Sequence, residues 1–370
     1  MVDKGIGLGL IGCGTVGRIR AELARETRAV EWLGLCDIDE QTAHRLGADT
    51  GADFVTTDMA ELLARPELTA VIIATAENDH VEPIMASVAR GVPLFIEKPL
   101  ATDPVASAEV LAAIERNGVD AVMGYTQRFR RRFLTVKQRL RDGQIGEVTS
   151  VVTRAFMNRM VVEATHRKTK DRSNLTPMVV SGTHSLDMSM WLMEGKTPVE
   201  VYARSIEKTL SAWGTKDATF GLFTMDDGTL FSMNINWALP VQWPGAVYGL
   251  EIGIVGTKGV IDIEDTHRDV ILASEIGQPA GYTSQGFQPP AARHVDFIGS
   301  YPPGDLSDGM LWGPMREETL TWYNRLTTGI RTPHATAAEG HRNLLLTMAM
   351  DKSARTGRPV SLPIQPSDLI

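Results

Sequence analysis

The chain has 370 residues, of which 43% are hydrophobic and 22% charged, and its formal net charge is −8 at pH 7. This length favours two domains of ordinary globular composition. The negative charge argues against nucleic acid or an anionic membrane as the main partner. No apolar run approaches the roughly 18 residues of a transmembrane helix, and no small-residue cleavage site follows the apolar N-terminal stretch. We therefore expect a cytoplasmic protein.

The chain contains only two cysteines, Cys13 and Cys36. Because they form neither a Cys-x-x-Cys pair nor a disulfide framework, a reducing compartment is the simplest inference. Each is expected near the end of one of the first two strands, as a small buried thiol. The cysteines predict no metal site, and we expect none.

The first 125 residues alternate between short apolar runs and helix-like segments. Runs that are apolar throughout suit parallel strands buried on both faces. The expected strands are Ile6–Ile11, Trp32–Cys36, Phe54–Thr56, Val71–Thr75, Leu94–Ile96 and Ala121–Gly124. The expected helices are Val16–Glu26, Glu40–Leu46, Met59–Ala64, Val81–Arg90 and Pro104–Asn117. This order indicates a doubly wound α/β domain with a parallel sheet over residues 1–125.

The alternation of strand and helix gives way to successive strands in residues 126–370. These residues are expected to form an α+β domain with a largely antiparallel sheet. Strands are expected at Val148–Phe156, Val199–Ser205, Ala218–Met225, Thr229–Trp237, Val247–Val255 and Val260–Ile263, and helices at Thr183–Met193, Pro314–Thr328 and Thr336–Thr356. The stretches 225–229 and 256–259 have the turn chemistry of antiparallel hairpins. Residues 275–313 are rich in Gly, Pro, Ser and Gln, which predicts a long surface loop.

Gly12, Gly14 and Gly17 form a G-x-G-x-x-G pattern between an expected strand and an expected helix. In that context the first glycine allows a tight turn, the second lets a pyrophosphate approach the backbone, and the third lets helix and strand pack closely. The helix N-terminus offers N–H groups and a partial positive charge to the phosphates. Asp37 lies 20 residues beyond Gly17, where a carboxylate would bind the adenosine ribose and repel a 2′-phosphate. The pattern predicts NAD rather than NADP, and the alternative is a similar turn that binds another nucleotide or none.

Glu97 and Lys98 follow an expected strand and precede Pro99. Ligands of doubly wound folds bind at the carboxyl ends of the strands. A lysine beside an oxidised nicotinamide could hydrogen-bond a substrate hydroxyl or share its proton. From spacing alone, a surface lysine in a loop is the simpler interpretation.

His184 is expected at the start of a helix, with Asp187 three residues later on the same face. Histidine ordinarily titrates near neutral pH, so it suits taking a proton from an alcohol, and a nearby carboxylate could orient it. A helix-capping or core histidine is the alternative, which the sequence alone favours.

A basic segment over residues 154–172 reverses the charge of this acidic chain; it contains Arg154, Arg159, His166, Arg167, Lys168, Lys170 and Arg172. Arginine forks match carboxylate, phosphate and sulfonate groups, so an anionic substrate group is one interpretation. A solvated loop or a subunit contact is the other. Trp237 and Trp243 could line a sugar-sized pocket, form a dimer face, or lie in the core.

Together these motifs resemble the Gfo/Idh/MocA family of oxidoreductases. The resemblance covers nearly the whole chain, through GLIGCGTVG, VIIATAENDHVEPIMASVARGVPLFIEKPLATD, GYTQRF, GTHSLDMSMWL, GTKGVIDI and LLLTMAMDKSARTGRPVSLP. It implies an NAD(P)-binding Rossmann domain and a second domain whose sheet forms the interface of a homodimer or homotetramer. It also implies oxidation or reduction of a secondary alcohol on a sugar, cyclitol or related ring.

The resemblance also implies roles for individual residues. It makes Lys98 and His184 catalytic. The implied NAD contacts are Gly12, Gly14, Thr15, Val16, Gly17, Asp37, Ile38, Thr75, His80, Glu97 and Lys98. The implied substrate contacts are Lys98, Arg128, His184 and Asp187, and the basic segment adds Arg167 as an expected contact with an anionic substrate.

Two positions depart from the family pattern. Many members carry an acid four residues before the histidine, where this chain has Val180, so a second carboxylate of an inositol-type site is missing. The tract GYNRRF of relatives reads GYTQRF at residues 124–129, which changes any contact made there to Thr126 or Gln127.

The expected reaction is reversible hydride transfer between the nicotinamide and a ring carbon that bears a hydroxyl. His184 would accept the hydroxyl proton while Lys98 holds the same oxygen. Two alternatives stay open. One is a glycosidase that oxidises a sugar transiently and returns the hydride to the same NAD; the other is a non-catalytic dinucleotide-binding sensor.

Overall fold

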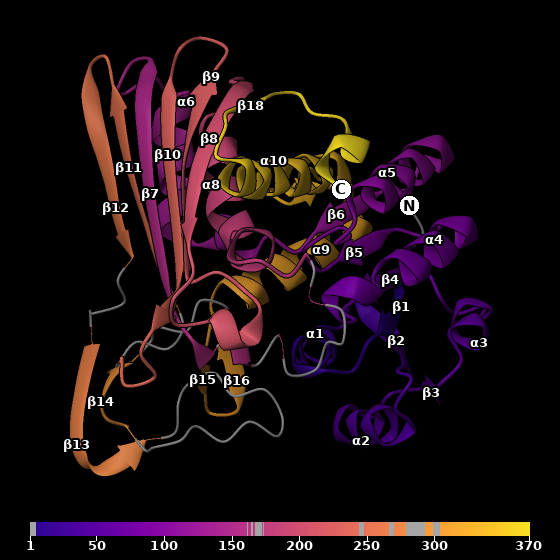
Figure 1. Cartoon of the computed structure of the whole chain (residues 1–370). Helices are drawn as coiled ribbons and strands as arrows, with labels where there is room; N and C mark the ends of the chain where they lie inside the picture. The colour runs from indigo at the N-terminus through magenta and orange to yellow at the C-terminus, as the bar shows by residue number, and fades with distance from the viewer. Residues whose placement is uncertain are drawn as a thin grey trace. The chain divides into compact units, whose positions relative to one another are not determined.

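The computed structural model describes residues 5–160, 162–163, 166, 172, 174–243, 248–265, 270–278, 293–298 and 304–370. These residues divide into two compact units (Figure 1). The first unit combines residues of 1–129 with 306–342, and the second combines residues of 130–305 with 343–370. In the described ranges, no helix has both the length and the apolar character needed to cross a membrane.

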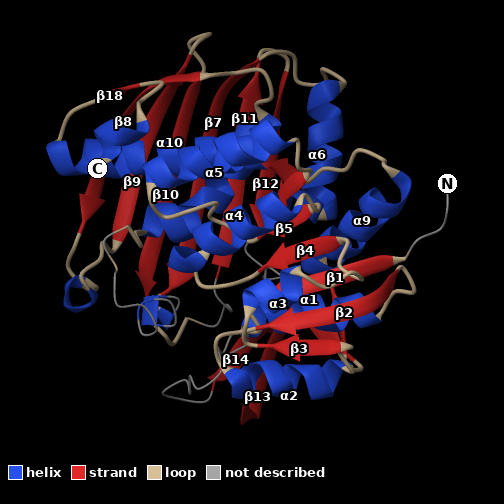
Figure 2. Ribbon diagram, turned by 90° about the vertical axis from the view of Figure 1, so that its right-hand side faces the viewer, coloured by secondary structure: helices blue, strands red, loops and turns tan. Residues whose placement is uncertain are grey.

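The first unit is built on a seven-stranded sheet in the order β17-β6-β5-β4-β1-β2-β3, of which the strands from β5 to β3 are labelled in Figure 2. Its strands are β1 (Ile6–Ile11), β2 (Val30–Cys36), β3 (Phe54–Thr56), β4 (Ala70–Ile73), β5 (Leu94–Ile96), β6 (Ala121–Met123) and β17 (Ala335–Thr336). The first six strands run parallel, and β17 joins β6 antiparallel. This is the strand order of a dinucleotide-binding fold, so the expected doubly wound sheet is confirmed.

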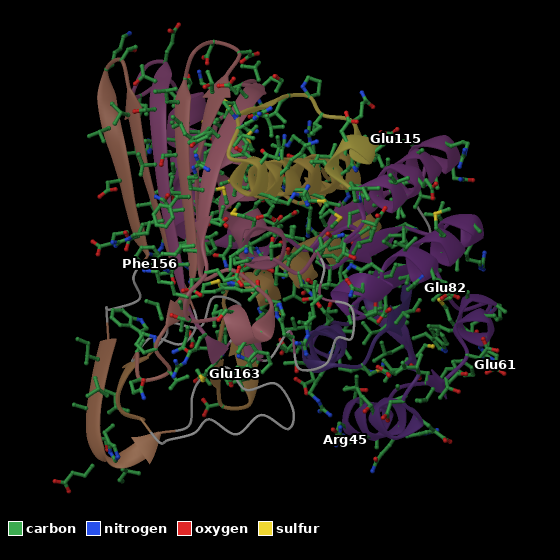
Figure 3. All side chains as sticks on the ribbon, in the orientation of Figure 1. Arg45, Glu61, Glu82, Glu115, Phe156 and Glu163 are labelled. Carbon is green, nitrogen blue, oxygen red and sulfur yellow. The ribbon has the colours of Figure 1, made fainter. Side chains whose placement is uncertain are left out.

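Amphipathic helices accompany this sheet. They are α1 (Thr15–Arg25), α2 (Glu40–Thr50), α3 (Met59–Leu63), α4 (Val81–Arg90), α5 (Pro104–Asn117) and α9 (Pro314–Thr328), with short 3₁₀ turns η1 (Glu77–Asp79) and η2 (Thr126–Phe129). Each of α2 to α5 turns charged side chains to solvent, as the exposed Arg45, Glu61, Glu82 and Glu115 show (Figure 3). The opposite stripe of each helix is buried, which is how helices of this kind cover a sheet.

The second unit contains a seven-stranded sheet in the order β12-β11-β7-β10-β9-β8-β18. Its strands are β7 (Val148–Asn158), β8 (Pro198–Ile206), β9 (Ala218–Met225), β10 (Leu230–Leu239), β11 (Tyr248–Gly256), β12 (Gly259–Asp265) and β18 (Val360–Ser361). Only the β7–β10 pair is parallel among the described pairings of this sheet. The expected antiparallel character is therefore confirmed.

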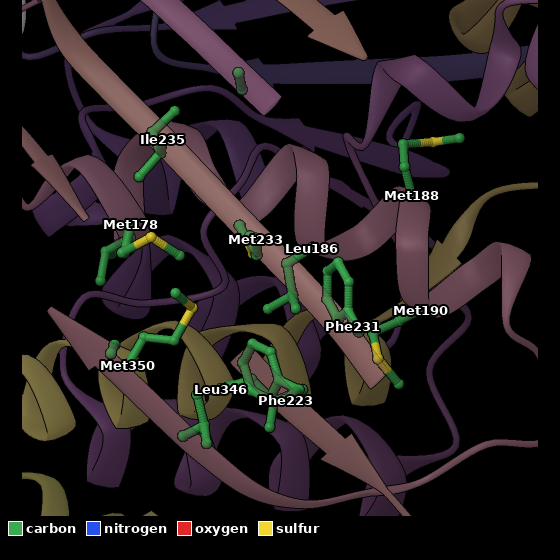
Figure 4. Packing of buried hydrophobic residues seen from close by; sticks show 14 of the residues in the cluster. Met178, Leu186, Met188, Met190, Phe223, Phe231, Met233, Ile235, Leu346 and Met350 are labelled. Carbon is green, nitrogen blue, oxygen red and sulfur yellow. The ribbon is translucent and has the colours of Figure 1, made fainter. Parts of the chain in front are cut away.

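The helical elements of the second unit are α6 (Arg131–Arg141), a π-helix η3 (Met178–Gly182), α8 (Thr183–Leu192), α10 (Ala337–Thr356, in this unit from Asn343) and the 3₁₀ turns η4 (Ser211–Trp213) and η5 (Pro366–Leu369). Both α8 and α10 lie on the same side of the sheet (Figure 1). Methionines from these helices and from β10 meet phenylalanines of β9 and β10 in the core (Figure 4). The flexible thioether of methionine fills such irregular gaps.

In the second half of the chain, one expectation was wrong and one helix was not expected. The long surface loop expected over 275–313 contains strands: β13 (Val270–Gln278) pairs with β14 (Arg293–Ile298), and β15 (Asp305–Ser307) pairs with β16 (Met310–Trp312). Helix α6 was not expected, because its many basic residues obscure an apolar stripe that includes the buried Phe133. Turn-rich composition hid the strands, since a two-stranded ribbon needs no long apolar run.

Candidate active site

The glycine turn after β1 has the geometry that its pattern predicts. Gly12 has φ +96°, a left-handed conformation that favours glycine. A Cβ on Gly17 would lie 1.9 Å from the Gly12 carbonyl oxygen, so only glycine lets α1 pack this closely. A Cβ on Gly14 would meet nothing within 4 Å, which leaves open space beside the turn. Two glycines are therefore required by the fold, and the third borders a free approach to the backbone.

The N-terminus of α1 differs from those of α2, α3 and α5. The carboxylates of Asp39, Asp58 and Asp103 accept first-turn N–H groups of α2, α3 and α5. Helix α1 instead begins after Gly14, with no side-chain cap from the described residues and no acid in its first turn. Its first-turn N–H groups, which include those of Thr15, Val16 and Gly17, suit an anion such as a pyrophosphate. These residues fit a dinucleotide.

Asp37, directly after β2, is held toward the glycine turn. The Cys13 N–H donates to Asp37 Oδ2 at 2.7 Å, and the Asp39 N–H donates to Oδ1 at 2.9 Å. Each oxygen retains a lone pair, so the oriented carboxylate can still accept hydrogen bonds from ribose hydroxyls. The next residue, Ile38, is 96% exposed, and a nucleobase would cover this apolar side chain. The contacts of Asp37 and Ile38 with the cofactor stay predictions.

The two cysteines lie where expected, as buried thiols at the ends of β1 and β2. Burial raises the pKa of Cys13 to about 12 and that of Cys36 to about 11. Neither thiol is a nucleophile at neutral pH.

Glu97 and Lys98 lie at the carboxyl end of β5. The Glu97 N–H donates to the Ile73 carbonyl at 2.9 Å, which extends the β4–β5 pairing to this residue. Lys98 follows, half-buried, and the Lys98–Pro99 peptide is cis. Lys98 is thus at the edge where ligands of this fold bind.

His80 connects the loops that follow β4 and β5. Its Nδ1 lies 2.6 Å from the Pro99 carbonyl oxygen, and its Nε2 lies 3.3 Å from that of Thr75. The ring is 1% exposed. His80 therefore holds the backbone beside Lys98. The predicted contacts of His80 and Thr75 with NAD remain predictions.

A buried charge cluster that includes Glu97, the residue before Lys98, was not predicted from the sequence. Arg20 of α1 donates from Nε and Nη2 to Glu97 Oε1, at 3.0 and 2.7 Å, and from Nη2 to Glu318 Oε2 of α9 at 2.7 Å. Thr126 Oγ1 donates to the same Glu318 oxygen at 2.8 Å. Loss of solvent raises the pKa of Glu318. The sequence does contain a signal for this cluster, because a charged residue lies on the buried stripe of α1 and another on that of α9. Arg20 follows Gly17 by three positions and so shares its face of α1.

Arg128, a predicted substrate contact, lies within the first unit and is 2% exposed. Its Nη2 donates to Glu339 Oε1 at 2.9 Å, and its Nη1 lies 3.4 Å from the Pro333 carbonyl oxygen. A substrate bound by Arg128 would compete with this ion pair. The substrate contact stays a prediction.

In the second unit, His184 lies on the first turn of α8 and is half-buried. The π-helix that precedes it contains Val180, at the position where many relatives carry an acid. Such π turns occur frequently at functional sites. Asp187 is 1% exposed and accepts a hydrogen bond from Asn343 Nδ2 of α10 at 2.9 Å. The Asp187 carboxylate is therefore engaged inside the unit.

A second contact with α10 fixes the start of the π-helix. Thr176 Oγ1 donates to Asp351 Oδ2 at 2.6 Å and accepts the Val179 N–H at 3.2 Å. Burial raises the pKa of Asp351 to about 7. Asn343 and Asp351 thus anchor the segment that carries His184, and sequence spacing gave no sign of either.

The basic segment divides into separate environments. Arg154 lies on β7 and pairs with Glu251 on β11, and Arg172 lies 5.9 Å from the Trp213 ring. Arg167 lies outside the described residues. Trp237 is fully buried and donates from Nε1 to Ser181 Oγ at 2.8 Å, so its core interpretation is confirmed.

The glycine turn, the uncapped helix and the lysine after β5 define a dinucleotide-binding enzyme of the Rossmann class. Residues 6–125 match a family model described as "Oxidoreductase family, NAD-binding Rossmann fold", and residues 133–262 match "GFO/IDH/MocA C-terminal domain". The chain belongs to the Gfo/Idh/MocA family and is an NAD-dependent oxidoreductase.

Known relatives agree with this assignment. The inositol 2-dehydrogenase of Gluconacetobacter diazotrophicus is 28% identical over 272 residues, which are 70% of this chain and 74% of that protein. The uncharacterized oxidoreductase YrbE of Bacillus subtilis is 22% identical over 98% of both chains. The structure of scyllo-inositol dehydrogenase from Lactobacillus casei, with NAD(H) and scyllo-inositol, aligns with TM-score 0.75 and 18% identity over 97% of this chain and 99% of that one.

Proposed function

We propose that the protein oxidises a secondary hydroxyl of a cyclitol or a related polyhydroxylated ring, with NAD as the hydride acceptor. The observation that carries the proposal is Lys98 at the carboxyl end of β5, in the same unit as the open glycine turn. Several relatives are named inositol 2-dehydrogenases, which supports a cyclitol.

Bound NAD supplies the carbon that accepts the hydride. The Lys98 ammonium donates a hydrogen bond to the substrate oxygen and stabilises the negative charge that develops on it. His184 accepts the hydroxyl proton as the carbonyl forms, so the substrate loses one hydride and one proton. Positioning by these two side chains contributes much of the rate enhancement.

The test is a panel of myo-inositol, scyllo-inositol, neutral pyranoses and sugar acids, each incubated with NAD while NADH absorbance is followed. We expect NADH formation with at least one cyclitol and loss of that activity in Lys98→Ala. Release of a free sugar from a glycoside without net NADH would replace the proposal with a transient-oxidation glycosidase. Tight NAD binding without turnover of any ring would indicate a sensor.

We also propose that the second unit's sheet forms a homo-oligomer interface. On the face opposite α8 and α10, register places Val152, Ser232, Leu222 and Tyr202 in one row across β7, β10, β9 and β8. The exposed apolar side chains of this face are Val152, Tyr202, Phe220, Leu222, Leu230, Val255 and Val260. An exposed apolar surface of this kind marks a protein interface.

Leu222→Asp should shift the protein to smaller assemblies in light scattering, and Ile330→Asp, at an exposed apolar residue of the first unit, should not. A wild-type monomer would contradict this proposal. The two buried thiols further support a reducing compartment such as the cytoplasm, which cell fractionation would test.

A further inference from the structure

We propose that Glu318 of α9 is a positioning residue for hydride transfer: through the Arg20 guanidinium that it shares with Glu97, it holds Lys98 at the carboxyl end of β5. This inference rests on the proposed function, since it takes Lys98 as the group that binds the substrate oxygen. Glu318 is about two hundred residues from Lys98 in the sequence, and the first unit brings the two segments together through one side chain.

Arg20 is fixed on every side. Its side chain is fully buried, and its guanidinium carbon lies 4.3 Å from the centre of the Phe95 ring on β5. Its nitrogens bond Glu97, Glu318 and Thr319, with a further contact of 3.4 Å to the Met315 carbonyl oxygen. A planar fork with this many partners has one orientation, so the carboxylate that it holds has one orientation too.

Glu97 is held at both its carboxylate and its backbone. A Cβ placed on Gly124 would lie 2.7 Å from Glu97 Oε2, so the carboxylate is pressed against the backbone after β6. The Glu97 N–H is bonded to the Ile73 carbonyl oxygen. With backbone and carboxylate both held, the adjoining Lys98 backbone is held as well. His80 fixes the following carbonyl, that of Pro99, from the other side.

One guanidinium faces two carboxyl groups in this cluster, and burial raises the pKa of Glu318. Glu318 is fully buried, and its Oε1 has no hydrogen-bond partner within the described residues, whereas its Oε2 accepts from both Arg20 and Thr126. Leaving a buried acceptor unmatched costs stability, and buried ion clusters are poor stabilisers in general. A cluster with this unmatched buried oxygen, bonded through Arg20 to the residue before Lys98, is better explained by positioning than by folding.

Thr126 offers a second way to perturb Glu318. It occupies a position where the GYTQRF tract departs from the tract of relatives, and its hydroxyl donates to Glu318. Thr126→Val removes that donor with little change in volume, so it perturbs Glu318 without touching Arg20 or Glu97.

The main variant is Glu318→Gln, which keeps the size and one acceptor oxygen but removes the charge, and the control is Glu317→Gln on the exposed side of the same helix. We expect Glu318→Gln to lower kcat about tenfold with KM for NAD changed less than about twofold, because a misplaced group slows the chemical step more than it weakens binding. Thr126→Val should lower kcat about threefold. Unchanged kcat in both variants would overturn the proposal. If Glu318→Gln fails to fold, unchanged kcat in Thr126→Val is enough to overturn it.

A double-mutant cycle separates positioning from a merely structural role. In a Lys98→Ala background, Glu318→Gln should cause no further loss of kcat, since the group that it positions is absent. An equal tenfold loss in both backgrounds would contradict action through Lys98. If Lys98→Ala retains wild-type turnover, the proposed function fails. If Lys98→Ala loses turnover but Glu318→Gln retains it, only the further inference fails.

A measurement without NAD or substrate completes the test. Lysines dimethylated with ¹³C-formaldehyde give separate NMR signals, and the Lys98 signal is identified by its absence in Lys98→Arg. We expect this signal to move in Glu318→Gln and in Thr126→Val and to stay in place in Glu317→Gln. A Lys98 signal indifferent to all three substitutions would contradict the proposal.

Discussion

The two units carry their functional residues in different ways. In the first, the predicted cofactor and substrate groups follow the carboxyl ends of β1, β2, β4, β5 and β6, where a parallel sheet collects its loops. In the second, His184 lies on a helix beside the sheet, and its position depends on a π-helix and on contacts with α10. In a parallel sheet, a site residue can thus be predicted from its position directly after a strand. A helix packed beside an antiparallel sheet offers no such signal.

The largest expected effects test whether both units contribute chemistry. Lys98→Ala should lower kcat about 10³-fold and His184→Ala about 10²-fold, within the range of general acid–base and electrostatic contributions. Steady-state kinetics at saturating NAD measures both, with Lys208→Ala at an exposed lysine as the control. Wild-type turnover in His184→Ala would confine the chemistry to the first unit.

Asp37→Ala should have the next largest effect, confined to the cofactor. Loss of the carboxylate removes charge-assisted hydrogen bonds of about 1.5–3 kcal/mol, so the Kd for NAD should rise about ten- to hundredfold and discrimination against NADP should weaken. Calorimetric titration with each nucleotide measures this, and Glu40→Gln, in the exposed first turn of α2, is the matched control. An unchanged NAD/NADP ratio would remove Asp37 from cofactor selection.

The last predictions concern the pH dependence of stability, and the two effects have opposite signs in the two units. Burial lowers the pKa of His334 in the first unit to about 3. Below about pH 6.5 the unfolded chain therefore binds a proton at His334 that the folded unit does not bind, so stability falls as pH decreases. Burial raises the pKa of Asp351 in the second unit to about 7, so the stability from its bound proton is complete below 3.8 and is lost as pH rises through 7. Each effect is bounded by about 1.4 kcal/mol per pKa unit.

Hydrogen exchange of peptides from each unit, measured across pH 4 to about 8, would resolve the two trends. Asp351→Asn should flatten the decline of protection toward high pH in the second unit only, and His334→Gln should flatten the decline toward low pH in the first. The same trend in both units would show that they open together.

Much of the first unit could be predicted from the sequence because its signals are local. Gly12 and Gly17 are fixed by backbone geometry within one turn, and the strands from β1 to β6 read as apolar runs of the right length. Asp37 followed from a spacing that the fold dictates. NAD binding, the doubly wound sheet and the family were therefore predicted and are confirmed.

The rest depended on contacts between distant segments. Arg20 and Glu318 were visible as charges on buried helical stripes, but nothing in the sequence says that the two stripes meet at Glu97. Asp351 and Asn343 lie on a helix with many other polar residues, and only the packing of α10 on α8 selects them. Among the described residues, β13 pairs only with β14 and β15 only with β16, and such two-stranded ribbons have few of the buried positions that make strands recognisable.

Residues 306–342 belong to the first unit, and this has a consequence for synthesis of the chain. They provide Trp322, which packs edge-on against Phe95 at 5.5 Å, Glu318, and strand β17 at the edge beside β6. A nascent chain that has released only its first 129 residues therefore holds an Arg20 that has Glu97 but lacks Glu318 and Thr319, and an open sheet edge. Residues 130–305 of the second unit are synthesised before residues 306–342. The nucleotide-binding unit therefore completes its folding late, although most of it is translated first.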